Sequence, residues 1–443
     1  MKNILLIPIL ILLLSACSSD NVQRTAEPET LHRMERRLTE LIIKDIFTPP
    51  VASRIYVYPS LAAWEAARYL DTTGNPSFTA RLKGFEPMPV PDLSKGPIDF
   101  ELASIRAFCA TARRVVFSKP DIDLLDAELT DIHSLGMDDE TIERSLAFGQ
   151  AVADVVIKRL AADQYLQTRG MERFEVVHTP GRWVPTPPDY ADGTEPHWPK
   201  IRTMVMDSSD QFNIPNPIPY SEDKNSPFWK ELTEVHETVN RVKDGSEEMD
   251  ILTFWDDNPF VSRHKGHLMF QDKKMTPGGH WMAITRVICR NEQTDFVRTA
   301  KAYALTSVSL FEAFISCWDL KYSAALVRPE TVISAKVEQE WHPHLITPPF
   351  PSYTSGHSTI SAAAAESLTA LFGDQVAFTD STELEFGLPV RSFPSFRDAA
   401  KEASISRVYA GIHYRSDCEQ GNHQGTMVGQ FVAARLVGAT RKN

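Results

Sequence analysis

Two cations in the last third of the chain have a spacing that could hold an anion. Lys321 and Arg328 are seven residues apart, which puts both on one face of a helix, about two turns from one another. Pro329 disfavours helical geometry at the residue before it, so we expect the helix to end at Arg328. An isolated pair of this kind is usually a solvated face, but this pair follows the most apolar helical stretch of the chain.

A second segment combines a serine, a glycine and a histidine where a helix is expected to begin. Extended, Pro-rich chain from Thr347 leads into Ser355-Gly356-His357, and an apolar, Ala-rich pattern continues to Phe372. The Ser355 hydroxyl and the Gly356 amide can donate to an oxyanion, which the positive end of the helix dipole also favours. His357 could then exchange protons with that anion. The alternative for this tripeptide alone is a capping serine beside a surface histidine.

A third segment pairs a histidine with an aspartate four residues later. On a helix, His413 and Asp417 would contact each other. A carboxylate on one imidazole nitrogen selects the tautomer and leaves the other nitrogen free as a ligand or a nucleophile. Arg407, six residues before His413, adds a third cation. Taken alone, the pair could equally be a surface His–Asp contact.

The three segments together resemble a known signature. Lys-x6-Arg-Pro, Ser-Gly-His and Ser-Arg-x5-His-x3-Asp are similar in order and spacing to the motifs of the type 2 phosphatidic acid phosphatase and vanadium haloperoxidase superfamily. Over about residues 250–435 the sequence resembles the haloperoxidase branch of this superfamily. Three segments carry this resemblance: Trp318-Asp-Leu-Lys321-Tyr, Thr347-Pro-Pro-Phe-Pro-Ser-Tyr and Gly279-His-Trp281. The chain departs from this signature at Thr354, where the family usually has proline. This difference affects the expected rigidity of the loop but not its hydrogen-bond donors.

The resemblance implies a role for each of these residues. His413 would bond the central atom of vanadate or phosphate, Asp417 would orient His413, and His357 would be the acid–base group. The oxygens of the anion would be held by Lys321, Arg328, Ser355, the Gly356 amide and Arg407. Without a bound anion, the three cations would disfavour protonation of His413 and keep it available as a ligand.

Two aromatic residues near this site resemble the halide pocket of fungal-type chloroperoxidases. Trp318 is three residues before Lys321, and Phe350 is seven residues before His357. A dry aromatic wall would favour a strongly oxidising site, so we expect chloride oxidation in addition to bromide oxidation. The alternative is that both rings are core aromatics beside the site.

The resemblance leads to three functional hypotheses. The first is a vanadate-dependent haloperoxidase that oxidises a halide with hydrogen peroxide, with an organic acceptor that the sequence does not identify. The length of 443 residues favours it, because soluble acid phosphatases of the superfamily are much shorter. The second is a phosphomonoesterase with His413 as nucleophile. The third is a surface lipoprotein that binds an anion without turnover, against which the complete set of catalytic positions argues.

The N-terminus has the pattern of a bacterial lipoprotein. Lys2 precedes a short apolar run, and Leu14-Ser15-Ala16-Cys17 is the pattern that a lipoprotein peptidase cleaves before lipidation of the cysteine. We therefore expect a signal peptide at 1–16, lipidated Cys17, a tether at 17–30 and attachment to the cell envelope, at the outer membrane or the periplasmic face, through the lipid alone. The net charge of -12 argues against nucleic acid as a partner.

The rest of the chain reads as helices. Apolar residues recur at helical spacing over 29–47, 100–117, 121–134, 139–162 and 295–321, and no run shows sustained strand alternation. A further helix is expected to end near Tyr69 and to start either at Ala52, with a kink at Pro59, or at Pro59 itself. The pattern predicts an all-α fold of two packed helical bundles, of the haloperoxidase and type 2 acid phosphatase kind.

The predicted boundary between the bundles falls near residue 245. An N-terminal bundle would cover 31–245, including a segment at about 168–228 that wraps the surface, and a catalytic bundle would cover 246–443. Ten prolines between 180 and 227 make this segment a long irregular one.

Several buried or reactive residues have no assigned role in this scheme. Glu312, on the most apolar helix, needs a partner and either is structural or orients a cation of the site. The four cysteines after Cys17 are widely spaced and read as small buried hydrophobes, with one disulfide still possible. Three histidines outside the motifs belong to no convincing metal-binding pattern and are expected to be structural: His280, His342 and His344.

Overall fold

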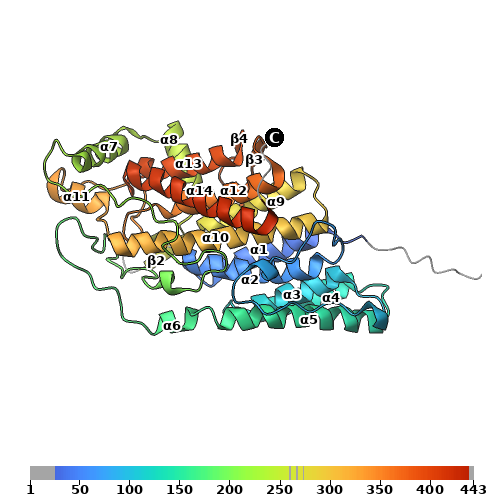
Figure 1. Cartoon of the computed structure of the whole chain (residues 1–443). Coiled ribbons are helices and arrows are strands. Elements are labelled where there is room, and N and C mark those ends of the chain that lie inside the picture. The colour runs from blue at the N-terminus through green and yellow to red at the C-terminus, as the bar shows by residue number, and fades with distance from the viewer. Residues whose placement is uncertain (1–24, 259–260, 266–267, 273, 439–443) are drawn as a thin grey trace, which may run out of the picture.

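The computed structural model describes residues 25–258, 261–265, 268–272 and 274–438. The predicted signal peptide, Cys17 and most of the tether lie outside these residues, so those predictions stay untested. The described chain is all-α, with its helices in two packed bundles (Figure 1), which confirms the predicted fold class. No helix within the described ranges is long and apolar enough to cross a membrane.

The helices of the first half begin where prolines or capping side chains allow it. Pro28 and Pro49 stand in the first turns of their helices, where the missing amide costs nothing, and Asp99 and Asp138 accept hydrogen bonds from free amides. The elements are α1 (Pro28–Lys44), α2 (Pro49–Ala67), η1 (Thr79–Arg81), η2 (Leu93–Lys95), α3 (Phe100–Ala112), α4 (Lys119–His133), α5 (Asp139–Ala161), α6 (Tyr165–Arg169) and η3 (Trp198–Lys200).

The second half contains the longest helix and every segment with a chemical motif. Its elements are α7 (Pro227–Arg241), α8 (Glu247–Phe254), β1 (Val261–Lys265), β2 (Leu268–Asp272), α9 (Pro277–Asn291), α10 (Phe296–Ala324), α11 (Pro329–Lys336), α12 (Gly356–Phe372), β3 (Phe378–Asp380), η4 (Thr382–Phe386), β4 (Arg391–Phe393), α13 (Phe396–Tyr409) and α14 (Arg415–Val437). Helix α12 ends at Phe372, as the Ala-rich pattern predicted, and α1 ends at Lys44, within the predicted stretch 29–47.

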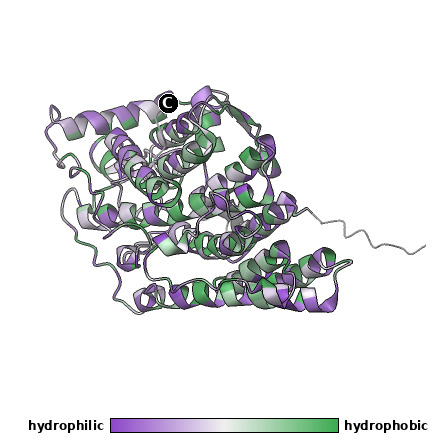
Figure 2. Cartoon of the chain, turned by 45° about the vertical axis from the view of Figure 1, so that its right-hand side comes forward, coloured by the Kyte–Doolittle hydropathy of each residue, from purple (hydrophilic) through white to green (hydrophobic). Residues whose placement is uncertain are grey.

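Helix α10 joins the two bundles. It packs against α2 on one side and against α12 and α14 on the other, while α2 packs against α3 and α5. In Figure 1 the layer of α3–α5 lies below α1, α2 and α10, and α12–α14 lie above them. One continuous apolar core, from Leu31 to Leu436, runs through both bundles. Helices at the edge of the molecule carry both hydrophobic and hydrophilic residues, as amphipathic helices do (Figure 2).

A close approach between α12 and α14 brings two of the motif segments together. Gly421, Gly425 and Gly429 recur every four residues along one side of α14 and face α12. A Cβ atom added at Gly425 would lie 1.9 Å from the carbonyl oxygen of Thr359, so the helices could not pack this closely with any larger residue. The start of α12 is thereby held beside the start of α14.

Two short antiparallel hairpins accompany the helices and were not predicted from the sequence. Strands β1 and β2 pair antiparallel with Val261 opposite Asp272, and β3 and β4 pair antiparallel with Phe378 opposite Phe393. Each strand has three or five residues, too few for the alternation of a longer strand to stand out in the sequence.

Two helix boundaries also differ from the prediction. Helix α2 begins at Pro49, before either expected start, and continues through Pro59. Helix α10 ends at Ala324, because Ala325 adopts a left-handed conformation with φ 46°. Arg328 is therefore the N-cap of α11 and does not lie on the helix of Lys321.

The Pro-rich segment is attached to the end of α10 by backbone contacts. Trp183 donates its amide to the carbonyl of Ala325. A second contact is made within α10, where the Glu312 side chain accepts three backbone amides of the segment, from Met204 at 2.6 Å, Val205 at 3.2 Å and Met206 at 2.7 Å. Of the two roles expected for Glu312, the structural one is therefore correct. Its carboxylate provides hydrogen-bond acceptors for the backbone amides of an irregular segment inside the core.

The four described cysteines are buried and free, so the interpretation as small hydrophobes is confirmed for Cys109, Cys289, Cys317 and Cys418.

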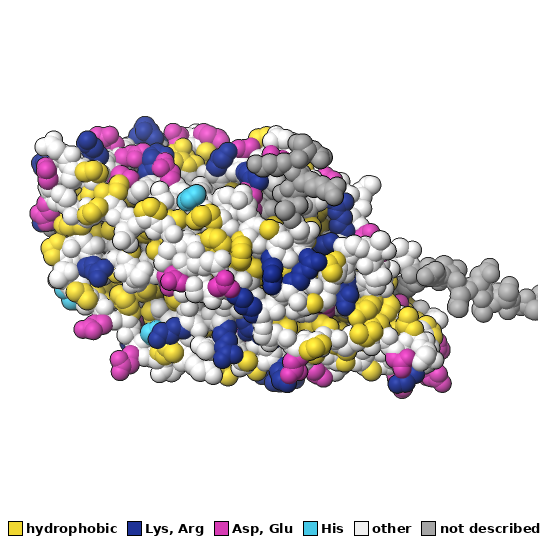
Figure 3. All heavy atoms as spheres, viewed as in Figure 1, with side chains coloured by type: hydrophobic (Ala, Val, Ile, Leu, Met, Phe, Trp, Pro, Cys, Tyr) yellow, Lys and Arg dark blue, Asp and Glu magenta, His cyan; other side chains and the backbone are white. Residues whose placement is uncertain are grey.

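On the face drawn in Figure 3, acidic and basic side chains are interspersed.

Candidate active site

Residues of two motif segments line one cavity, and the third segment, with Lys321 and Arg328, lies against the Phe350 ring in its wall. Its wall contains His357 and Gly356 from the start of α12, Arg407 from α13, and His413 from the turn before α14. The aromatic part of the wall is made by Trp318 and Phe350 together with Phe314. Residues that are up to 364 positions apart in the chain, from Pro49 to His413, thus face one space.

Lys321 and Arg328 come together although a helix break separates them. Both side chains are fully buried. The Lys321 ammonium lies 4.8 Å from the centre of the Phe350 ring, and the Arg328 guanidinium lies 5.1 Å from the same centre. Lys321 donates to the carbonyls of Pro351 at 3.0 Å and Ser352 at 3.1 Å, and Arg328 donates to that of Phe350 at 2.8 Å. The loop that contains Phe350 therefore brings the two cations together, which one continuous helix was expected to do.

Arg407 completes a cluster of three buried cations. It projects from α13 and donates to the carbonyl of Trp255 at 2.6 Å. Within the described part of the chain, none of Lys321, Arg328 and Arg407 has a carboxylate within ion-pair distance. Burial lowers the pKa of Lys321 to about 7 and that of Arg328 to about 10, and it also lowers the pKa of Arg407. Buried cations without counter-ions are costly, so the cluster calls for an anion.

His413 is oriented by a carboxylate and a serine. Its Nδ1 atom lies 3.0 Å from Oδ2 of Asp417, and the Ser352 hydroxyl donates to the same oxygen at 2.5 Å. The other ring nitrogen, Nε2, lies 3.1 Å from Nη1 of Arg328. The predicted contact is confirmed, but it is not a contact along a helix, because α14 begins only at Arg415 with Tyr414 as its N-cap.

Burial shifts the pKa of each member of this pair toward its neutral form. Burial, followed by the charges of Arg328, Lys321 and Arg407, lowers the pKa of His413 well below its ordinary value. This agrees with the expectation that the cations keep His413 unprotonated. Burial also raises the pKa of Asp417 to about 7, although the hydrogen bond from Ser352 acts in the opposite direction.

Ser355, Gly356 and His357 form the first turn of α12, as predicted. Ser355 is the N-cap and accepts the amide of Ser358 at 3.3 Å, which leaves the proton of its hydroxyl available. As the first helical residue, Gly356 has an amide without an acceptor inside the helix. Thr354, which replaces the usual proline, is buried and donates to Gln424 at 2.9 Å, so the loop is anchored by a side chain instead.

The His357 side chain faces the cavity with one nitrogen free. Its Nε2 atom is buried without a hydrogen-bond partner and lies 3.7 Å from Oδ2 of Asp257. Burial, then the charges of Arg407 and His280, lowers the pKa of His357 well below its ordinary value. A neutral imidazole with a free nitrogen can accept a proton from a bound molecule.

Trp318 and Phe350 form the apolar wall of the cavity. Their ring centres are 5.1 Å apart. The indole nitrogen of Trp318 donates to the carbonyl of Thr194 at 3.1 Å, so its donor is already used. Both rings line the cavity, and they also belong to the apolar core: Trp318 is a buried member of it and Phe350 packs against it.

Two further residues contact this site and were not predicted from the sequence. Ser352 lies in the Pro-Ser-Tyr part of the second motif segment, and its hydroxyl donates to Asp417. Asp257 belongs to Trp255-Asp-Asp, which has no motif character, and only the packing of this loop against α12 brings it near His357. His342 and His344 line no part of the cavity.

The chain is similar to haloperoxidases in sequence and in fold. Residues 301–440 match the model of the VCPO second helical-bundle domain. A bacterial vanadium-dependent iodoperoxidase of known structure is 45% identical, with a TM-score of 0.88 over 93% of this chain and 97% of that one. No curated protein matches the chain in sequence. The chain therefore belongs to the vanadium-dependent haloperoxidase family.

Two more distant structures share the fold. Holo and apo forms of a bacterial vanadium-dependent chloroperoxidase are each 17% identical, with TM-scores of 0.67 and 0.64. They cover 89% and 88% of this chain, and 94% and 95% of their own chains are matched. The family membership confirms the prediction of an enzyme with vanadate as its cofactor.

The residues present fit a tetrahedral oxyanion. Three fully buried cations without carboxylate partners in the described chain surround a neutral histidine whose Nδ1 is taken by Asp417. This donor set would complement a vanadate or phosphate anion in charge, because the anion would supply the missing negative partner.

Proposed function

We propose that this enzyme oxidises iodide with hydrogen peroxide, at vanadate held by the three motif segments. The identity of 45% with an iodoperoxidase, over nearly the whole of both chains, supports iodide as the principal halide. The observation that carries the site assignment is the group of three buried cations around His413.

Each motif residue has a distinct task in this proposal. His413 binds vanadium through Nε2, the nitrogen that Asp417 leaves free. Asp417 orients the ring and holds the tautomer. The vanadate oxygens take hydrogen bonds from the remaining donors, which are Lys321, Arg328, Ser355, the Gly356 amide and Arg407. When bound, vanadate supplies the Lewis acidity that activates peroxide, and the protein supplies position and charge.

His357 is the acid–base residue of the proposed reaction. Its low pKa keeps the ring neutral at physiological pH, and Nε2 has no partner in the described structure. It can therefore take the proton of incoming hydrogen peroxide and return it to the product water. The apolar wall of Trp318 and Phe350 excludes water beside it and forms the halide pocket.

A paired assay of two activities tests the proposal. Metal-free protein is expected to oxidise iodide only after vanadate is added, and inorganic phosphate should compete for the site. The phosphomonoesterase hypothesis predicts the opposite result: turnover of a phosphomonoester by the vanadate-free protein and inhibition by vanadate. Robust phosphatase turnover with no halide oxidation at any vanadate concentration would overturn the proposal.

The halide range is measured in the same assay. Iodide is the easiest halide to oxidise and chloride the hardest, so an iodide enzyme need not turn over chloride. The expectation of bromide and chloride oxidation, which follows from the aromatic wall, stays a prediction beside the proposal for iodide. Iodination of a phenolic probe measures the reaction although the organic acceptor is not identified. The probe takes the place of that acceptor and receives the oxidised halogen.

We also propose that the mature enzyme is a lipoprotein of the bacterial cell envelope, at the outer membrane or the periplasmic face. The support is the Leu14-Ser15-Ala16-Cys17 sequence after a short apolar run. A diacylated cysteine would be the only attachment to the membrane. Phenolic or other organic acceptors would then meet the enzyme outside the cytoplasm.

A further inference from the structure

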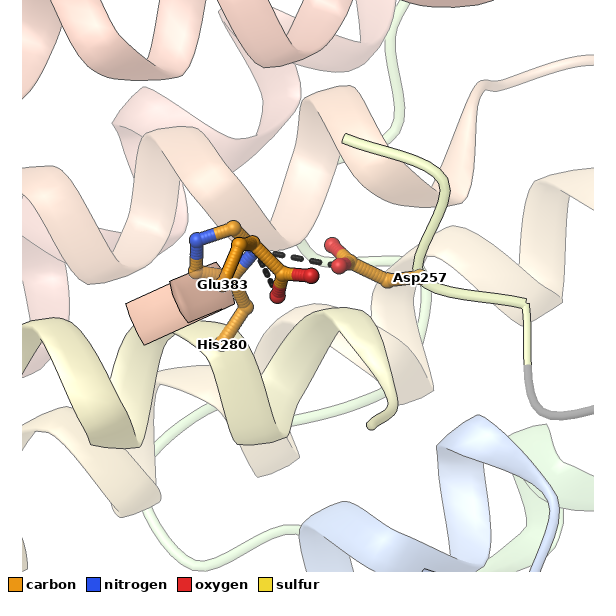
Figure 4. Close-up of side chains that lie close together, drawn as sticks. All are labelled: Asp257, His280 and Glu383. Carbon is orange, nitrogen blue, oxygen red and sulfur yellow. Dashed lines mark hydrogen bonds and ion pairs between the residues drawn. The ribbon is translucent and has the colours of Figure 1, made fainter. Parts of the chain in front are cut away.

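A buried cluster of one histidine and three carboxylates lies behind His357. Nδ1 of His280, in α9, is 3.0 Å from Oδ1 of Asp257 and 3.7 Å from Oε1 of Glu383 in η4. Nε2 of the same ring is 3.0 Å from Oδ2 of Asp380, at the end of β3. The exposed fraction of these four side chains is at most 4%. Figure 4 shows Asp257 and Glu383 pointing toward the same edge of the His280 ring.

We propose that Asp257, His280 and Glu383 bind a divalent transition-metal ion, at a second metal site that is separate from the vanadate site. The three candidate ligand atoms, Oδ1, Nδ1 and a Glu383 oxygen, all lie within 4.8 Å of one another. Ligands at about 2.1 Å from a common ion are roughly 3.0–3.4 Å apart in octahedral or tetrahedral geometry. The separations of 3.0 and 3.7 Å around Nδ1 need only small side-chain shifts to reach that spacing.

The oxygen of Glu383 gives an independent sign of a missing partner. Oε1 is buried and has no hydrogen bond, and its distance of 3.7 Å to Nδ1 of His280 is too long for one. A buried carboxylate oxygen without a partner is rare, because no hydrogen bond then offsets the free energy lost on removing that oxygen from water. A cation between Glu383, His280 and Asp257 would satisfy it.

Asp380 supplies the outer contact that metal-bound histidines commonly have. It contacts Nε2 of His280 at 3.0 Å, while Nδ1 is hydrogen-bonded to Asp257 at 3.0 Å. An ion that replaced the Nδ1 proton would sit between Nδ1 and Asp257, and Asp380 would then hold the tautomer with the proton on Nε2. Asp380 is itself fixed, since its Oδ1 accepts the amide of Thr382 at 2.9 Å and the Thr382 hydroxyl at 2.7 Å. This arrangement prepares the imidazole for a ligand role.

Charge balance also favours a divalent ion. Three buried carboxylates surround a single imidazole, and the neighbouring Lys274 is engaged with Asp256 at 2.8 Å. One nitrogen and two oxygen ligands suit a first-row ion such as Zn²⁺ or Mn²⁺. Ca²⁺ and Mg²⁺ are disfavoured, since they prefer six or more oxygen ligands.

The proposed ion would act on the active site through Asp257. Its Oδ1 faces His280 and its Oδ2 lies 3.7 Å from Nε2 of His357. An ion that fixes Oδ1 would also fix the position of Oδ2 beside the acid–base histidine. We therefore assign Asp257 as a positioning residue that links the two sites.

Zinc binding by the full-length mature protein tests the proposal. Protein made metal-free with a chelator and then dialysed is titrated with Zn²⁺ alone, followed by calorimetry, metal analysis and the melting temperature. We expect about one tightly bound Zn²⁺ per chain and a higher melting temperature. Glu383→Gln and His280→Ala should weaken binding by roughly 100-fold or more, and Asp380→Asn by roughly 10- to 100-fold. His342→Ala, at an exposed histidine outside the cluster, is the matched control.

Glu383→Gln also distinguishes a metal from a proton. If the cluster instead holds an imidazolium and a protonated Glu383, glutamine mimics that acid and the variant should fold normally, while the metal-free wild type should take up neither Zn²⁺ nor Mn²⁺. That result would overturn the proposal. Zinc retained with unchanged affinity by both Glu383→Gln and His280→Ala would overturn it as well, since the ion would then lie elsewhere. Vanadate loading, measured separately, should still occur in Glu383→Gln.

Discussion

Oδ2 of Asp417 contacts both Nδ1 of His413, at 3.0 Å, and the hydroxyl of Ser352, at 2.5 Å. The carboxylate therefore transmits the position of the Pro-rich loop to the proposed vanadium ligand. Contacts of this kind commonly change metal affinity by one to two orders of magnitude.

We expect Asp417→Ala to weaken vanadate binding by about 10- to 100-fold. Ser352→Ala should have a smaller effect in the same direction, since Asp417 keeps its contact with His413. Equilibrium dialysis with vanadium analysis measures both. Ser323→Ala, at an exposed serine of α10, is the control. Unchanged affinity in Asp417→Ala would show that the orientation of His413 does not depend on this carboxylate.

The two histidines of the site should fail at different steps. His413→Ala removes the proposed ligand and should abolish vanadate binding, whereas His357→Ala should leave binding largely intact and lower kcat by about 100-fold or more. Bound vanadium and the rate of iodide oxidation are measured on the same preparations. Equal loss of vanadium from both variants would mean that the two roles are assigned wrongly.

Phe350 should influence which halides are oxidised. Its ring gives the cavity an apolar wall, and Phe350→His would place a hydrogen-bond donor beside the bound oxidant and make it a weaker oxidant. We expect any chloride oxidation by the wild type to fall in this variant by more than iodide oxidation does, measured as the ratio of the two kcat/KM values. Phe372→His, at the far end of α12, is the control. A wild type that oxidises iodide or bromide but never chloride, even at acidic pH, would show that the aromatic wall does not serve chloride.

Glu35 should make the stability of the protein fall as the pH rises. This carboxyl group is buried, with one oxygen bonded to Ser60 at 2.6 Å and the other without a partner, and burial raises its pKa to about 8. The folded state thus holds its proton more tightly than the unfolded state does. Its contribution to stability is fully present below pH ~4.5 and is lost as the pH rises through about 8, by at most about 1.4 kcal/mol per pH unit.

Urea unfolding of Glu35→Gln tests this prediction. The amide cannot ionise and keeps an oxygen for Ser60, so the variant should lose less stability than the wild type between pH 5 and 8. Glu40→Gln, at a more exposed position of α1, should behave like the wild type. Parallel pH profiles for wild type and Glu35→Gln would contradict the buried-acid explanation.

Membrane attachment should depend on Cys17 alone. Cys17→Ser removes the thiol that would carry the lipid, so the protein should leave the membrane fraction without a change in vanadate-dependent activity. Fractionation of cells followed by the iodide assay measures both properties. A variant that stays tightly membrane-bound after cleavage of its signal peptide would require a second anchor.

The sequence by itself was sufficient for the fold class and for every motif residue of the cavity. Helical spacing of apolar residues is a local property, so it predicted the all-α fold and the start of α12 at the Ser355-Gly356-His357 segment. The spacing of Ser355, Gly356 and His357 is equally local, because one helix turn presents all three. Short hairpins such as β3–β4 escaped detection, since three residues are too few for a periodic signal.

Contacts between distant segments were decided only by the tertiary structure. Lys321 and Arg328 meet through the ring of Phe350 and not along a helix, because Ala325 ends α10 between them. Asp257 reaches His357 and His280 only because the loop after α8 packs against α9 and α12. Side-chain partners of this kind depend on which backbones lie beside one another, and no periodicity along the chain encodes that.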